Sequence, residues 1–141
     1  MFFTALRVEK VSSDPPTWRL LSDLIYQGVT RIYKLEVPIE VRVPAGFRTD
    51  FASVPRLPVA FLLTGDTAQR AATVHDFLYE AGRPCVHSAL VLTRKQADDL
   101  FLQAMTNSGI PRWRRNMMYY AVRAFGGGAW RHYRELKPTN Q

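Results

Sequence analysis

Residues 31–46, "RIYKLEVPIEVRVPAG", decide the first half of the fold. Their apolar side chains recur at every second position, at Leu35, Val37, Ile39, Val41 and Val43. Because side chains alternate between the two faces of a strand, this spacing predicts a strand with one buried face. Pro38 has no N–H to donate to a neighbouring strand, so the strand is predicted to lie at a sheet edge or to contain a bulge.

Towards the N-terminus, residues 3–11 and 17–27 are also predicted to be strands. Two short stretches rich in turn residues are predicted to separate the strands: "SSDPP" at 12–16 and "QGVT" at 27–30. The first fifty residues are therefore expected to form a small antiparallel sheet.

After Asp50 the apolar spacing becomes helical. Residues 53–65 are predicted as a short helix or an irregular apolar segment. Three helices are then expected: one ending at Gly82, one opened by a Thr93–Gln96 capping box, and one from Pro111 to the triple glycine at 126–128. The glycines predict a break before a short last helix, since glycine disfavours helix interiors.

The fold class predicted is α+β, a small N-terminal antiparallel sheet followed by three to four packed helices. The 141 residues are expected to form a single domain, mainly β over 1–50 and mainly α over 51–137, with a tail at 138–141. No apolar run is long enough for a transmembrane segment, and no export signal is recognised. The single cysteine excludes an intramolecular disulfide and suits a reducing compartment.

The positive charge is concentrated at the C-terminal end. Residues 1–111 hold 12 Lys and Arg against 11 Asp and Glu, whereas residues 112–141 hold seven against one, which accounts for six of the seven net charges. Such a segment is either a solvated basic helix or a contact for nucleic acid, anionic lipid or an acidic protein surface.

An adjacent histidine and aspartate, His75 and Asp76, interrupt an otherwise apolar helical segment. Helical spacing places the histidine on the apolar face, which consists of Ala68, Ala71, Ala72, His75, Leu78 and Tyr79. This pair is either a polar junction accommodated in the core or part of a catalytic or metal site.

Asp98 is the predicted partner of His75. It shares a helical stripe with Phe101, Leu102 and Met105, so it leans towards the core, where Arg94 one turn earlier can offset its charge. If the two helices pack antiparallel, Asp98 reaches the imidazole and fixes one ring nitrogen, which leaves the other to act as a base or ligand. Asp99, by contrast, is expected to form an exposed pair with Lys95.

Asp50 lies where strand gives way to helix, in "GFRTDFASVPR". It either accepts amide hydrogen bonds as a helix cap or joins His75, Asp76 and Asp98 as a further ligand or orienting carboxylate.

The last long helix aligns Arg112, Arg115, Tyr119 and Arg123 on one side, opposite an apolar stripe of Trp113, Met117, Tyr120, Ala121 and Ala124. The apolar stripe is expected to pack on the core. The charged back, together with Arg131 and Arg134 beyond it, is the predicted partner-binding surface.

These motifs in order, "GFRTDFASVPR", "HDFLY", "R-x-x-x-D-D-x-x-F" and "MMYYAVRAFG", resemble a small phage- and prophage-encoded family of unassigned function over roughly residues 40–130. The resemblance implies a bacteriophage or prophage origin. It suggests a virion component, assembled in the host bacterial cytoplasm with other virion proteins and associated with the tail.

A second resemblance is local. His75, Asp76 and Tyr79, followed by Asp98 on the next helix, are similar to the active-site helices of phospholipases A2. That resemblance implies His75 as general base, Asp98 and Tyr79 as the residues that orient it, and Asp76 as a ligand of a divalent cation such as calcium. Asp50 is the candidate further metal ligand from its place at the strand–helix junction. The glycine-rich calcium loop of those enzymes has no counterpart before His75.

Three functions are thus open. The preferred one is a phage virion component that docks through its basic C-terminal helix, with the His75 cluster stabilising the junction of sheet and helices. The alternatives are a metal-assisted esterase of phospholipase A2 type acting on the bacterial envelope, and a cytosolic phage factor that binds nucleic acid or a host protein.

Overall fold

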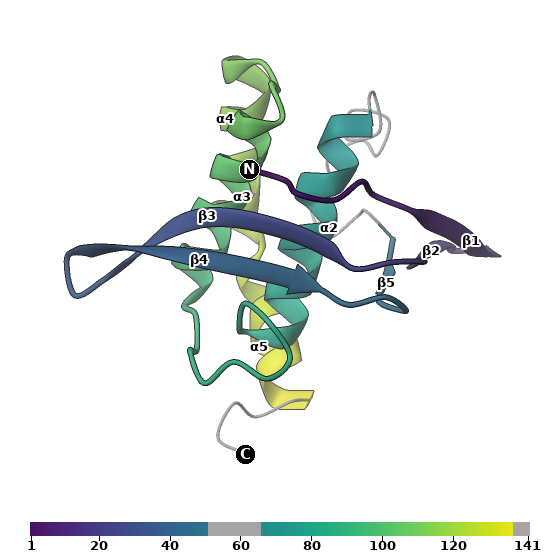
Figure 1. Cartoon of the computed structure of the whole chain (residues 1–141), viewed down its shortest axis with the longest axis horizontal. Helices are drawn as coiled ribbons and strands as arrows, with labels where there is room; N and C mark the ends of the chain where they lie inside the picture. Colours follow the sequence, from purple (N-terminus) through teal and green to yellow (C-terminus); the bar gives the residue numbers. More distant parts are fainter. Residues whose placement is uncertain (51–65, 137–141) are drawn as a thin grey trace.

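A computed structural model describes residues 1–50 and 66–136 of the chain. Five strands come first and form two small antiparallel sheets (Figure 1). β1 (Val8–Ser13), β2 (Pro16–Leu20) and β5 (Arg48–Thr49) make one sheet in the order β1-β2-β5, and β3 (Leu24–Ile32) pairs with β4 (Leu35–Val43) in the other.

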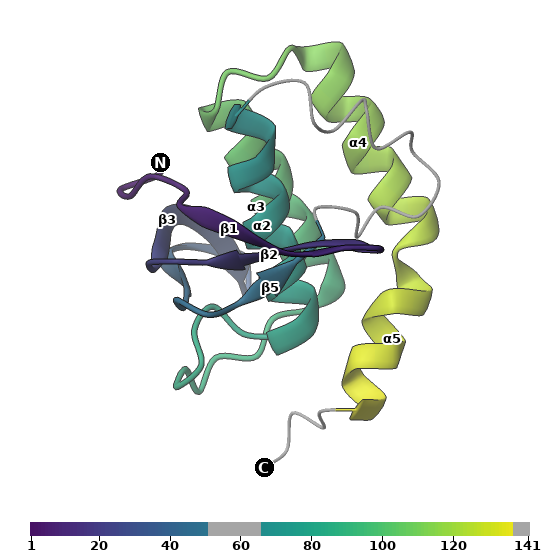
Figure 2. The same cartoon turned by 90° about the vertical axis from the view of Figure 1, so that its right-hand side faces the viewer.

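Four helices are described after the strands: α2 (Asp66–Ala81), α3 (Arg94–Asn107), α4 (Arg112–Phe125) and α5 (Gly127–Leu136). α2 and α3 lie in the middle of the molecule, with the strands on one side and α4 and α5 on the other (Figure 2). The α+β fold class predicted from the sequence is confirmed. The predicted segment 53–65 and the tail lie outside the described residues.

β4 confirms the predicted alternation, because Ile39, Val41 and Val43 are all buried. β4 is an edge strand of its sheet, as Pro38 indicates. The amide of Arg42 donates away from β3, to the carbonyl of Pro84 (2.9 Å). Because amide directions alternate along a strand, position 38 also points outwards, and the missing N–H of Pro38 removes no bond to β3.

The turn predicted at 27–30 is wrong, because these residues lie inside β3. Gly28 is required there for close packing: a Cβ at this position would lie 2.9 Å from the ring of Tyr26 and 3.0 Å from Leu100 of α3. The chain instead reverses at Tyr33 and Lys34, which adopt positive φ angles of 48° and 70°. The strand predicted over 17–27 is two strands, β2 and β3.

Two glutamines of α3 fix this helix against β3. The side chain of Gln103 accepts from the amide of Val29 (3.0 Å) and donates to its carbonyl (2.6 Å), and Gln96 donates to the carbonyl of Arg31 (2.8 Å). The glutamines therefore satisfy backbone groups at the edge of β3 that another strand would otherwise use. This arrangement sets the position of α3, which carries Asp98.

The predicted helix ends are confirmed. Thr93 caps α3 in a capping box with Gln96, and Gly82 follows α2 with a φ angle of 66°. The triple glycine marks a break, since α4 ends at Phe125 and α5 begins at Gly127.

Candidate active site

The predicted pairing of His75 and Asp98 is confirmed. α2 packs against α3, and the two side chains meet between these helices with exposed fractions of 1% and 0%. The helix face predicted to carry His75 is buried along its whole length, from Ala68 to Tyr79.

One oxygen of Asp98 holds the imidazole. His75 Nε2 lies 2.8 Å from Asp98 Oδ1, and the hydroxyl of Tyr79 donates to the same oxygen at 2.7 Å. The imidazole also stacks on the ring of Phe101, with 4.4 Å between the ring centroids. The ring is therefore fixed in both position and orientation.

The other oxygen of Asp98 faces two arginines. Arg123 of α4 donates to Oδ2 at 2.7 Å, and Arg94 lies 3.9 Å from it. Arg94 was predicted from its spacing on the same helix. Arg123 was not, because nothing in a sequence separation of 25 residues indicates that α4 approaches Asp98 with this residue.

The hydrogen bonds to Asp98 determine which ring nitrogen carries the proton. Burial raises the pKa of the Asp98 carboxyl, but the hydrogen bonds from His75, Tyr79 and Arg123 outweigh it and hold that pKa below its ordinary value. The carboxylate is thus ionised and can only accept. A neutral His75 therefore carries its proton on Nε2 and has a lone pair on Nδ1.

The same network changes the pKa of Tyr79. Burial, together with the hydrogen bond to the ionised Asp98, raises the pKa of Tyr79 well above its ordinary value, so the hydroxyl stays protonated. Tyr79 is therefore a fixed donor to Asp98.

Asp76 and Asp50, the predicted metal ligands, differ in environment. Asp76 is buried and accepts from the hydroxyl of Thr49 at 2.5 Å, and Asp50 is exposed. Burial, with the negative charges of Glu80, Asp76 and Asp50, raises the pKa of Tyr133. Within residues 1–50 and 66–136, no three His, Cys, Asp or Glu side chains gather as a metal site. The described residues thus provide no carboxylate cluster for calcium, and the metal-ligand role of Asp76 and Asp50 remains a prediction.

The expected orientation of α4 is wrong. Arg115, Tyr119 and Arg123 are half-buried and lie towards the molecule, whereas Trp113 and Tyr120 of the supposed core stripe are 63% and 68% exposed. The cause is the set of acceptors beneath the helix. Arg123 binds Asp98, Tyr119 donates to Asp99 (2.7 Å), and Arg115 donates to the carbonyl of Ile110 (3.2 Å).

Arg134 is also directed inwards. It donates to the carbonyls of Tyr79 and Glu80 at the end of α2, at 2.6 and 2.7 Å, and stacks on Trp130. Of the predicted partner-binding residues, Arg112 and Arg131 are the exposed ones. The partner-binding role itself remains a prediction.

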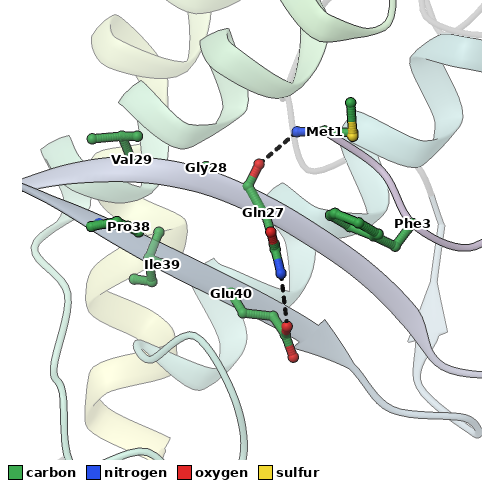
Figure 3. Close-up of a pocket in the computed structure, with 8 residues that line it drawn as sticks. All are labelled: Met1, Phe3, Gln27, Gly28, Val29, Pro38, Ile39 and Glu40. Carbon is green, nitrogen blue, oxygen red and sulfur yellow. Dashed lines mark hydrogen bonds between the residues drawn. The ribbon is translucent and has the colours of Figure 1, made fainter.

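A surface hollow of about 430 Å³ lies elsewhere, over β3, β4 and the N-terminal residues (Figure 3). Its lining includes Met1, whose amino group donates to the carbonyl of Gln27, and Glu40, which accepts from the Gln27 side chain at 3.2 Å. His75, Tyr79 and Asp98 are not among the lining residues, so this hollow is separate from the histidine site.

Within the described parts of the chain, no helix combines the length and apolar character needed to cross a bilayer.

The fold and site define a small α+β protein with a histidine–aspartate pair buried between two helices. Residues 18–122 match the model of a family described as a protein of unknown function (DUF1353), and the chain belongs to this family. Neither the curated proteins nor the solved structures contain a match to the chain.

Proposed function

We propose that this protein is an ester hydrolase in which His75 acts as the general base. The observation that supports this most strongly is the hydrogen bond between His75 Nε2 and Asp98 Oδ1, which fixes the ring tautomer and leaves Nδ1 as a proton acceptor. A carboxylate behind an imidazole stabilises the positive charge that the ring gains on accepting a proton.

In the proposed reaction, Nδ1 of His75 takes a proton from water as the water attacks the ester carbonyl. The same proton then passes to the departing alcohol, so the products are a carboxylic acid and an alcohol. Asp98 and Tyr79 keep the ring oriented during both transfers. These steps are written for His75, Asp98 and Tyr79 alone, since no cluster of three or more His, Cys, Asp or Glu side chains that could hold a metal ion occurs in the described parts of the chain.

The resemblance to phospholipases A2 supports this proposal and suggests the substrate class. His75, Tyr79 and Asp98 have the mutual contacts that the resemblance implies. Acyl esters of the bacterial envelope are the substrates it suggests. Because the His75 side chain is 1% exposed, the proposal requires the residues around the ring to separate when substrate binds.

The decisive experiment compares His75→Asn with His132→Asn, which alters an exposed histidine of α5. Hydrolysis of phosphatidylglycerol in detergent micelles is measured with calcium and with a chelator, and circular dichroism establishes that each variant is folded. We expect the wild type and His132→Asn to be active and folded His75→Asn to lose activity by about a hundred-fold or more. A wild type without activity in both conditions, or an active His75→Asn variant, would rule out the proposal.

A second candidate function, a tail-associated bacteriophage virion component, is supported by the β3–β4 hairpin. The hairpin projects past the helices (Figure 1), and its tip exposes Tyr33 (96%) and Leu35 (69%). Large apolar side chains on a projecting element are suited to contact a neighbouring subunit. The ordered sequence motifs support the phage origin, and exposed Arg112 and Arg131 can contribute to docking.

Mass spectrometry of purified phage particles tests this second candidate. We expect the protein in a fixed number of copies per particle, and Tyr33→Ser with Leu35→Ser is expected to reduce its incorporation because the substitution removes the apolar tip. Particles that lack the wild-type protein would exclude a role in the virion.

A further inference from the structure

We propose that the outer face of α4 binds the surface of an anionic membrane. This face consists of Trp113, Met117, Tyr120 and Ala124, which follow one another at spacings of three and four residues, with Phe125 beside its end. The proposal concerns binding alone and does not depend on the hydrolase activity.

The first observation is the apolar outer face of α4, which the helix carries in addition to Met118 and Val122, the apolar residues buried on its inner side. An ordinary surface helix directs its apolar side chains inwards and its charges outwards. In α4, Arg115, Tyr119 and Arg123 lie towards the molecule. The apolar side chains of Trp113, Met117, Tyr120 and Phe125 are 63%, 37%, 68% and 59% exposed. α4 lies on the side of the molecule away from the strands (Figure 2). The exposed fractions of its large apolar side chains show that this face is accessible.

The second observation is charge. Residues 112–134 contain six arginines and no acidic residue. Arg112 at the start of α4 and Arg131 beyond its end are exposed, so positive charge lies near both ends of the apolar face. Aromatic residues with arginines around them are typical of helices that lie in the headgroup region of anionic bilayers.

Two other binding partners fit the outer face of α4 less well than a membrane does. A second copy of this chain would bring two arginine-rich, acid-free helices together, which like-charge repulsion opposes. An acidic protein partner matches the charge, but the four large side chains expose only on the order of 500 Å², below the roughly 800 Å² per partner of a stable protein interface. Insertion into lipid headgroups requires no such minimum area, since each aromatic side chain that enters the headgroup region contributes to the binding free energy.

The test measures flotation of the purified protein with vesicles of phosphatidylglycerol and phosphatidylethanolamine, and with vesicles of phosphatidylcholine alone. We expect binding to the anionic vesicles that weakens as salt is added. Trp113→Gln combined with Tyr120→Gln is expected to weaken this binding at least about ten-fold, because each ring loses its apolar contact with the lipid.

The matched control is Tyr33→Gln with Leu35→Gln, which removes an equally exposed aromatic and aliphatic pair from the β3–β4 hairpin and should leave vesicle binding unchanged. Circular dichroism checks that both double variants are folded. A complementary measurement is tryptophan emission, which should shift to shorter wavelength on vesicles in the wild type and much less in Trp113→Phe.

Three results would overturn the proposal. One is a wild type that does not bind anionic vesicles, and another is equal binding by the α4 and hairpin variants. The third is wild-type binding to a polyglutamate peptide, or self-association in sedimentation, that the α4 variant abolishes while vesicle binding is unaffected. The last result would assign the face to an acidic protein or to a second copy.

Discussion

Replacing Asp98 by asparagine is expected to reduce the free energy of unfolding by about 3 kcal/mol, since the removal of one partner from a buried ion pair is among the costliest substitutions. The Asp98 side chain has no exposed surface and accepts from His75, Tyr79 and Arg123. An asparagine of the same shape loses the charge, and its amide group places donors opposite donors. Arg123 is then left without its acceptor.

Asp99→Asn is the matched control, because it makes the same chemical change at the next position of α3. Asparagine at position 99 keeps an oxygen that can accept from the hydroxyl of Tyr119, so the interaction removed is the exposed ion pair with Lys95 at 2.7 Å. Its loss should cost less than about 1 kcal/mol. Urea denaturation of the two variants at neutral pH measures the difference, and equal costs at positions 98 and 99 would contradict the structure.

The Asp98 effect also has a defined pH dependence. The pKa of this carboxyl is lowered in the folded protein, so folding favours its ionised form. The stabilisation is complete at pH values above the unfolded pKa of about 3.9 and is lost as the pH falls through the folded value. The stability gap between wild type and Asp98→Asn should therefore be constant from neutral pH down to about pH 5 and become smaller in stronger acid.

The sequence predicts the pair of helices that carry His75 and Asp98 because local rules suffice for them. Helical spacing places both residues on inward faces, and the capping box at Thr93 and Gln96 sets where α3 begins. Their contact requires only that neighbouring helices pack together. The sequence order of His75, Tyr79 and Asp98 therefore carries most of the information about this part of the site.

The orientation of α4 could not be predicted by the same rules. One stripe of α4 carries three arginines and the other is apolar, so hydrophobicity alone favours burying the face that contains Trp113. The hydrogen-bond acceptors that determine the orientation of α4 are Asp98 and Asp99, which belong to another helix, α3. Pairing a buried carboxylate with a cation stabilises the folded protein more than the burial of one further aromatic ring does.

The turn between β3 and β4 was missed for a related reason. Tyr33 and Lys34 both adopt positive φ angles, which are usually occupied by glycine or asparagine in such hairpins, so no residue marks the turn. Gly28, which does resemble a turn residue, is needed for contact between β3 and Leu100 of α3. The reason for a glycine at position 28 is therefore a contact with α3, a helix far later in the chain.

The triple glycine provides the second large prediction, because its first and third glycines should respond in opposite directions to the same substitution. Gly126→Ala is expected to destabilise the protein by about 1–3 kcal/mol, as overpacking does in tight sites. A Cβ at Gly126 would lie 2.5 Å from the hydroxyl of Tyr79 and 2.5 Å from the carbonyl oxygen of Val122. Tyr79 cannot move away without losing its hydrogen bond to Asp98.

Gly128→Ala is the control, and it should stabilise the protein by about 0.5–1 kcal/mol. Apart from its chain neighbours and the backbone of its own helix, no atom of the described residues lies within 4 Å of a Cβ at Gly128. The residue is in α5, where alanine loses less conformational entropy than glycine on folding. Urea denaturation of both variants gives the comparison. A stabilised Gly126→Ala variant would mean that Tyr79 does not approach the start of α5, and the packing of α5 beside the His75–Asp98 pair would then be incorrect.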